Sequence, residues 1–289
     1  AGNIFMGMTE SPVLIKNYLP TMNRSEIFLV MVSGMGTIAG SVMGTYIGML
    51  GGTDPAAKVL FATHLLSASV MAVPGSIVLA KMLCPQTEEA TDHVAISGKE
   101  KENSNILDAI SSGTVTGVKL MTNIAAMLLV FISLVALANY ITEGVIGRYT
   151  GLNDWIVKIT DGKAQGLTFQ FILGVITSPF MWLIGVPSQD IMLVGSLLGQ
   201  KTILNEFVAY FQLQQWKDAG LFMYEKSILM STYILCGFAN ISSIGILLGG
   251  LGVLAPEKRG LISRIGVPAM IGGALVSVLS ATIIGMILG

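Results

Sequence analysis

Two glutamates stand in otherwise apolar parts of the sequence. Glu10 belongs to the stretch NIFMGMTESP, and Glu206 belongs to GQKTILNE, which has apolar residues on both flanks. An ionised carboxylate within a membrane costs about 2.5 kcal/mol or more. Folding alone gives no reason to accept that cost twice, so we predict that both carboxylates accept hydrogen bonds from a polar substrate. The alternative is a structural role, in which backbone amides or a lysine such as Lys201 neutralise them.

A second polar group follows in the stretch GFANISS. Asn240 and Ser243 are three residues apart, which would make them neighbours on one face of a helix. An amide that both donates and accepts hydrogen bonds, beside a hydroxyl, suits a ligand with several hydroxyl groups. Phe238 could stack on a flat ring. The alternative is that Asn240 and Ser243 only join helices, as these residue types often do in membranes.

Small residues repeat in the stretch SGMGTIAGSVMG, where Gly36, Gly40 and Gly44 are spaced four apart. This spacing is typical of closely packed membrane helices. If the helix is also interrupted there, carbonyl oxygens near Thr37 and Ile38 would be free to hold a cation.

The composition indicates an integral membrane protein. Of the 289 residues, 53% are hydrophobic and only 11% are charged, and the mean hydropathy is +0.74. Soluble domains are usually about 25% charged. The net charge of −1 gives no basic field for nucleic acid. Because the sequence has no Walker motif, HExxH or GxSxG, we expect neither an ATP-driven pump nor an enzyme, and no organic cofactor.

Interrupted hydrophobic segments occur in both halves of the chain. In each half, a hairpin with a glutamate precedes a span broken by small and hydroxyl residues, which is the pattern of a transporter's binding site. We therefore predict an all-α polytopic membrane protein with inverted repeats, two re-entrant helical hairpins and two broken transmembrane helices. The predicted segments are the second limb of a first hairpin (1–25), a broken helix and the next transmembrane helix (26–83), a hydrophilic loop (84–104), a long helix (105–147), an interfacial and bent apolar segment (148–187), a second hairpin (188–225), and a broken helix with the last transmembrane helix (226–289).

Taken together, these motifs resemble the concentrative nucleoside transporter family. The matching stretches are GMTESPVLIKNYL, AGS, LIGVPSQDIMLVGSLLGQKTILNEFVAY and CGFANISSIGILLGG, and they cover nearly the whole chain. The family has further N-terminal helices and a first limb of the first hairpin, so we expect an N-terminal part to be missing from this sequence.

The resemblance implies a multi-pass protein of the plasma membrane, which in bacteria is the inner membrane. Members of the family are homotrimers surrounded by lipid that carry nucleosides inward, coupled to Na⁺ or H⁺. A transport domain built on the hairpins and broken helices moves like an elevator against a trimeric scaffold. Residues 106–146 resemble the long scaffold helix at the trimer centre.

The resemblance also implies roles for individual residues. Those expected to meet the nucleobase or to pack near it are Thr9, Glu10 and Val42. Those expected to contact the ribose hydroxyls, or to lie beside them, are Glu206, Asn240, Ser243 and Phe238. The expected Na⁺ ligands are side-chain oxygens of Asn3 and Thr37 and backbone carbonyls of Met6 and Ile38. Met8, beside the base, stands where many members have glutamine, so the selectivity for the base is left open.

Two other functions are compatible with the residues. The chain could belong to a transporter of another polar solute, such as a nucleobase or a sugar. It could also belong to a membrane receptor or scaffold that transports nothing and uses its broken helices only for packing.

Overall fold

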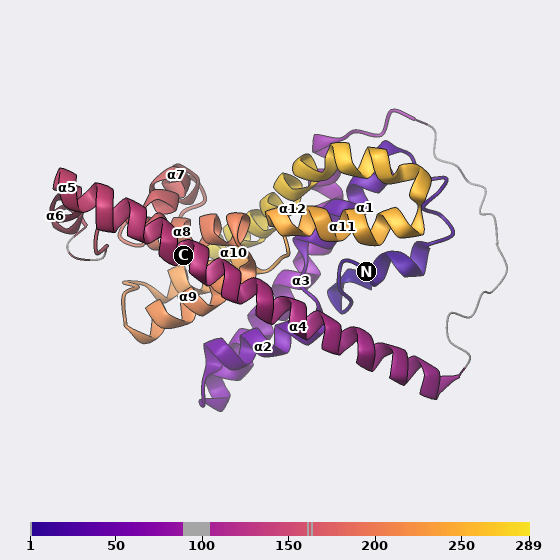
Figure 1. Ribbon diagram of the computed structural model, residues 1–289, viewed down its shortest axis with the longest axis horizontal. Coiled ribbons are helices and arrows are strands. Elements are labelled where there is room, and N and C mark those ends of the chain that lie inside the picture. Colours follow the sequence, from indigo (N-terminus) through magenta and orange to yellow (C-terminus); the bar gives the residue numbers. More distant parts are fainter. Residues whose placement is uncertain (1, 89–104, 161, 163) are drawn as a thin grey trace. The chain divides into compact units, whose positions relative to one another are not determined.

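The computed structural model describes residues 2–88, 105–160, 162 and 164–289. Within these ranges every regular element is a helix and no strand occurs, which confirms the predicted all-α class (Figure 1). Most of the hydrophilic loop predicted over 84–104 lies outside the described residues. The chain divides into two compact units, one formed by Ala1–Val94 with Gln170–Gly289 and the other by Ala95–Phe169.

The second unit is built on one long helix. Helix α4 (Ile106–Asn139) continues directly as a π-helical segment, η3 (Tyr140–Gly147). It is followed by α5 (Arg148–Thr150) and α6 (Leu152–Ile159). The side chain of Asn153 closes the unit at this end, because its amide donates to the Glu143 carbonyl (3.0 Å) and its oxygen accepts from the Leu167 amide (2.9 Å).

The first unit begins with a segment of turns and short 3-10 helices, η1 (Gly2–Ile4) and η2 (Ser11–Ile15). Three helices follow, α1 (Arg24–Gly36), α2 (Gly40–Gly51) and α3 (Pro55–Leu83). Asn23 starts α1 with a capping box, in which its side chain accepts from the Glu26 amide and the Glu26 carboxylate accepts from the Asn23 amide.

The remainder of the first unit starts with α7 (Phe169–Leu183), although Phe169 itself is assigned to the second unit. Two helices joined by a tight turn follow, α8 (Ile191–Ile203) and α9 (Glu206–Asp218). The chain then forms α10 (Glu225–Leu235), α11 (Ile241–Leu254), η4 (Pro256–Lys258) and α12 (Arg259–Ile287). The buried carboxylate of Asp190 joins the start of α8 to the start of α10, because it accepts from the amides of Met223 and Tyr224.

The helical backbone is interrupted at both places where the sequence predicts it. Residues 37–39 separate α1 from α2, and residues 236–240 separate α10 from α11. The two interruptions touch, because the Phe238 amide donates to the Thr37 carbonyl oxygen (3.3 Å). Gly237 permits this approach: its φ is +150°, and a Cβ there would lie 2.9 Å from the Met35 carbonyl oxygen. We call the first interruption the first break and the second the second break.

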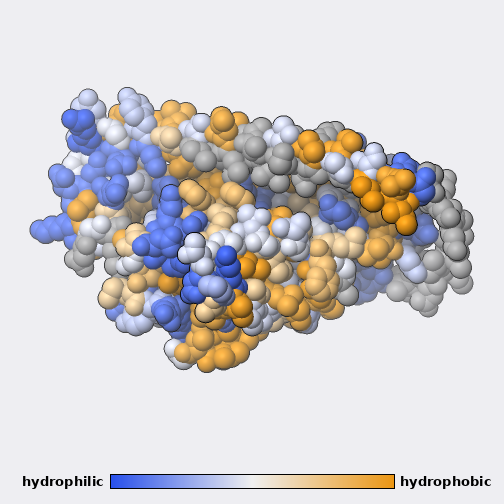
Figure 2. Space-filling view, turned by 90° about the horizontal axis from the view of Figure 1, so that it is seen from below, coloured by the Kyte–Doolittle hydropathy of each residue, from blue (hydrophilic) through white to orange (hydrophobic). Residues whose placement is uncertain are grey.

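Three helical stretches, one of them interrupted by the first break, are long and apolar enough to cross a membrane. Among the described residues these stretches are Arg24–Gly51, Pro55–Leu83 and Pro256–Ile287. Large apolar side chains also lie at the surface, such as Trp182, Leu183 and Met286, and Figure 2 shows extensive hydrophobic areas on the visible face. These features support a multi-pass membrane protein, because lipid would cover apolar side chains that would otherwise face water.

The buried apolar residues of the first unit form two clusters. One joins α2, α8, α9 and α10 with the first part of α3, Met181 of α7 and Ala281 of α12. The other joins the N-terminal segment, α1, α11 and the earlier part of α12 with the later part of α3. Phe238, in the second break, packs against both clusters. The two breaks therefore lie where the two halves of the core meet.

Candidate functional site

Glu206 is held at the start of α9 by groups from two other parts of the first unit. Asn205 caps this helix, since its side-chain oxygen accepts from the Val208 amide (2.9 Å), and Glu206 is then turned inward with 6% of its surface exposed. One carboxylate oxygen accepts from the hydroxyl of Tyr46 and the other from the side-chain amide of Asn240, each at 3.1 Å. Hydrogen bonds to an ionised group are the strong ones, so this carboxylate is firmly oriented.

Asn240 links Glu206 to Ser243. The Asn240 side-chain oxygen caps α11 by accepting from the Ser243 amide (2.9 Å), and it also accepts from the hydroxyls of Ser242 (2.6 Å) and Ser243 (3.0 Å). The expectation that Asn240 and Ser243 are neighbours is confirmed, but capping at a break brings them together, not the face of a continuous helix. Glu206, Asn240 and Ser243 thus form one buried network.

Tyr46 is a member of the site that the sequence did not single out. It lies on α2, is fully buried, and stacks on Tyr210 with a ring separation of 4.1 Å. The Tyr210 hydroxyl donates to the Thr232 carbonyl oxygen (2.8 Å), which fixes the stack on α10. A tyrosine in an apolar, glycine-rich helix gives no periodic signal that separates a site residue from a core residue.

The hydrogen bonds of Lys201 go to groups other than Glu206. Its ammonium is fully buried and donates to the Ile234 carbonyl oxygen (2.7 Å) and the Ser277 hydroxyl (3.0 Å). The long side chain of Lys201 reaches across to α10 and α12, which its separation of five residues from Glu206 could not reveal.

Residues 2–22, predicted as part of a first hairpin and called the first hairpin segment below, present their side chains in different environments. Glu10 is exposed, and its carboxylate lies so closely over Gly7 that a Cβ there would clash with it. Its predicted role in accepting hydrogen bonds from a substrate stays a prediction. Thr9 is half-buried against Gly250 of α11, where a Cβ would lie 3.1 Å from the Thr9 methyl group. Met8 is buried and packs equally closely on Gly34 of α1.

The residues expected to bind Na⁺ lie around the first break. Asn3 donates to the Ser33 hydroxyl (2.8 Å), the Thr37 hydroxyl donates to the Ser33 carbonyl oxygen (3.0 Å), and Ser11 donates to the Asn3 side-chain oxygen. Asn3, Thr37 and Ile38 are buried, and Met6 is half-buried. The Gly40 amide donates to the Phe5 carbonyl oxygen (3.0 Å), which ties the hairpin segment to the start of α2. Neutral oxygen donors of this kind suit a hard cation.

The two apolar residues expected beside the substrate pack against the core clusters. Val42, in the first turn of α2, packs half-buried against the cluster that contains Tyr46, and Phe238 is half-buried between both clusters. The carboxylate network, the oxygen donors of the first break and a half-buried aromatic ring therefore all belong to the region where the two breaks meet.

Comparison with known proteins gives a consistent result. Residues 64–285 match the family described as Na⁺ dependent nucleoside transporter C-terminus. The chain is 39% identical to an uncharacterised transporter of Haemophilus influenzae over 292 residues, which span 100% of this chain and 65% of that protein. It is 39% identical to sodium/nucleoside cotransporter 1 of Rattus norvegicus over 301 residues, 99% of this chain and 43% of that protein.

A solved structure of CNTnw in an inward-facing substrate-bound state matches with a TM-score of 0.82 at 35% identity, covering 100% of this chain and 63% of that one. A variant of CNTnw in an outward-facing state matches with a TM-score of 0.83 at 36% identity, covering 98% of this chain and 63% of that one. The chain thus spans less than two thirds of the length of these relatives. It belongs to the family of Na⁺-dependent nucleoside transporters, whose C-terminal part it matches.

Proposed function

We propose that the protein containing this chain is a cation-coupled nucleoside importer. The observation that carries the proposal is the buried network of Glu206, Asn240 and Ser243, in which each carboxylate oxygen already accepts one hydrogen bond. A sugar hydroxyl both donates and accepts. A ribose hydroxyl donates to Glu206 and accepts from the Asn240 amide. When the Ser243 hydroxyl gives up its bond to Asn240, it bonds to a neighbouring ribose hydroxyl.

Ribose enters this network by exchanging hydrogen bonds. Glu206, Asn240 and Ser243 are 6%, 2% and 1% exposed, so their present bonds are mostly to one another. The turn between α8 and α9 carries Glu206, and a small displacement of this turn separates the carboxylate from Asn240. Because a bound hydroxyl replaces bonds that already exist, the buried polar groups stay satisfied in both states.

The nucleobase meets the first hairpin segment. Met8 is buried in the core and can neither donate nor accept a useful hydrogen bond. Thr9 and the exposed carboxylate of Glu10 are the nearby groups that can bond to a base. Val42 and Phe238 supply apolar contacts to its faces.

Na⁺ binds at the first break and couples transport to its gradient. Asn3 and Thr37 supply side-chain oxygens, and Met6 and Ile38 supply backbone carbonyls. The bonds through Ser33, and the bond from Gly40 to Phe5, support this because they join the hairpin segment to the break. A cation at the first break holds the first hairpin segment, which binds the base, against the second break, which binds the ribose.

We further propose alternating access in which the first unit moves like an elevator, with both hairpin segments re-entrant and the two halves related as inverted repeats. Contact between the two breaks supports this, as do the CNTnw structures in opposite-facing states. The protein is a homotrimer of the plasma membrane, which in bacteria is the inner membrane. Exposed apolar side chains on α4, such as Leu129, Leu134 and Leu137, support its role as a scaffold helix.

The test is uptake of labelled uridine by the protein reconstituted in liposomes. We expect accumulation above equilibrium under a Na⁺ gradient and competition by nucleosides, with weak competition by uracil, which lacks ribose. Accumulation driven only by a proton gradient would show that the coupling ion is H⁺ and not Na⁺. Equal competition by uracil would indicate a nucleobase transporter, and absence of gradient-driven uptake would contradict the proposal in favour of a receptor or scaffold.

A further inference from the structure

The two breaks face the same electrostatic problem. The last carbonyl groups of a helix have no partner within that helix, and the helix dipole makes this end partly negative. Here α1 ends at Gly36 and α10 ends at Leu235, both among buried residues. A positive group at such an end offsets the partial charge and bonds to the carbonyl oxygens.

At the second break the positive group is a side chain. The Lys201 ammonium donates directly to the Ile234 carbonyl oxygen (2.7 Å). It also donates to the Ser277 hydroxyl (3.0 Å), which in turn donates to the Cys236 carbonyl oxygen (2.9 Å). One ammonium therefore serves two carbonyl groups at the end of α10, one of them through a hydroxyl, and it is fully buried.

At the first break the side chains that bond to the end of α1 are neutral. Thr37 donates its hydroxyl to the Ser33 carbonyl oxygen, and Asn3 bonds to the Ser33 hydroxyl. These are the residues to which the proposed function assigns the coupling ion. The first break is therefore equipped with oxygen donors, whereas the second break carries its own cation.

We propose that Lys201 is a tethered cation that occupies, at the second break, the place an inorganic ion takes at the first. The inference rests on the proposed cation coupling at the first break. It follows that only the first break exchanges an ion during transport. Lys201 also acts as a positioning residue, because it fastens α8 to α10 and α12 and so fixes the turn that presents Glu206.

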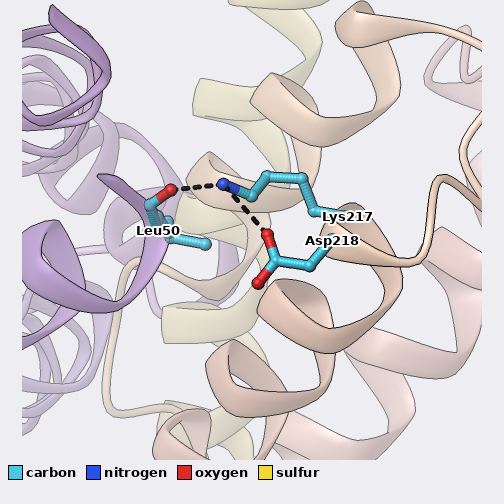
Figure 3. A network of polar contacts seen from close by, with 3 residues as sticks. All are labelled: Leu50, Lys217 and Asp218. Carbon is cyan, nitrogen blue, oxygen red and sulfur yellow. Dashed lines mark hydrogen bonds and ion pairs between the residues drawn. The ribbon is translucent and has the colours of Figure 1, made fainter. Parts of the chain in front are cut away.

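Another lysine provides a matched control. In Figure 3 the ammonium of Lys217, on α9, lies between the Leu50 carbonyl oxygen at the end of α2 and the Asp218 carboxylate, 3.5 Å from the latter. Lys217 also bonds to the end of a helix, but its side chain is partly exposed, and the helix end that it contacts, at Leu50, belongs to neither break. Its removal leaves a position that water can fill.

The experiment compares three variants of the reconstituted protein. Lys201→Ala removes the ammonium and vacates its place, Lys201→Met removes the charge but keeps the bulk, and Lys217→Ala is the control. We expect uridine uptake by Lys201→Ala to fall at least tenfold and to recover at least threefold with methylammonium chloride, relative to choline chloride. Lys201→Met stays impaired in both salts, and Lys217→Ala is insensitive to the choice of salt.

A second measurement does not depend on transport. The unfolding temperature of each purified variant in detergent is recorded in methylammonium and in choline, with methylammonium present throughout preparation. If methylammonium raises the unfolding temperature of Lys201→Ala and of no other variant, the result supports the tethered cation. Failure of the wild type to take up uridine would count only against the proposed function. The inference is overturned if Lys201→Met takes up uridine normally, or if methylammonium restores neither the uptake nor the stability of Lys201→Ala.

Discussion

The two segments predicted as hairpins each carry a glutamate but hold it in different ways. Glu206 opens a regular helix, is almost fully buried, and accepts hydrogen bonds from Tyr46 and Asn240. Glu10 precedes a short 3-10 helix, is exposed, and has its carboxylate over Gly7. The comparison teaches that an apolar sequence context does not determine the burial of an acid. Donors brought in by other elements determine it.

The largest effect is expected for Glu206→Gln. The change removes the negative charge and replaces one of the two accepting oxygens by an amide that donates, so one hydrogen bond of the network is lost and the acceptor proposed for ribose is weakened. We expect kcat/KM for uridine to fall by about 100-fold or more, which corresponds to losing about 3 kcal/mol of such bonds. Uptake assays in liposomes measure this, with the oligomeric state as a control for folding. Uptake close to the wild-type rate would remove Glu206 from the substrate site.

Tyr46→Phe tests whether the orientation of Glu206 matters as well as its charge. The variant keeps the ring stacked on Tyr210 but loses one hydrogen bond to the carboxylate, so we expect about a tenfold loss in kcat/KM. Tyr210→Phe is the matched control, since its hydroxyl bonds to Thr232 and not to Glu206. That control should lower the unfolding temperature and leave the KM for uridine near the wild-type value. A similar rise of KM in both variants would point to damaged packing.

The first break is tested by Asn3→Ala and Thr37→Ala. Each change removes one neutral oxygen donor, and we expect the Na⁺ concentration for half-maximal uptake to rise about fivefold. The measurement is uptake as a function of Na⁺ at fixed pH, with a proton gradient as the comparison. If the Na⁺ response is unchanged while uptake follows the proton gradient, the break does not bind the coupling ion.

The smallest effect is expected for Glu10→Gln. An exposed carboxylate contributes a hydrogen bond that competes with water, so we expect KM for uridine to rise about threefold or less. Competition between different nucleosides in the same assay would show whether the preference for the base changes. A loss as large as that of Glu206→Gln would mean that Glu10 becomes buried against the substrate, and the contrast between the hairpins would disappear.

The sequence predicts those parts of the fold that depend on composition and length. Apolar spans and their polar interruptions locate both breaks, because an interrupted helix needs small or polar residues to satisfy its free backbone groups. Asn240 and Ser243 are likewise predictable as neighbours. The long helix expected over 106–146 corresponds to α4 and its π-helical continuation.

Long-range partners are not predictable in the same way. Tyr46 meets Glu206 across 160 positions of the chain, and Lys201 meets Ser277 across 76. Neither pairing leaves a local pattern, because it depends on how α2, α8 and α12 pack. The exposure of Glu10 likewise depends on which other elements pack around its segment.

Binding of uridine and of 2′,3′-dideoxyuridine to the wild type and to Glu206→Gln tests the central claim most directly. If Glu206 and its network hold the ribose hydroxyls, the wild type binds uridine at least about tenfold more tightly than the dideoxy analogue, and the variant binds both with similar, weak affinity. Equal affinities in the wild type, or a preference for uridine that survives in the variant, would contradict the account.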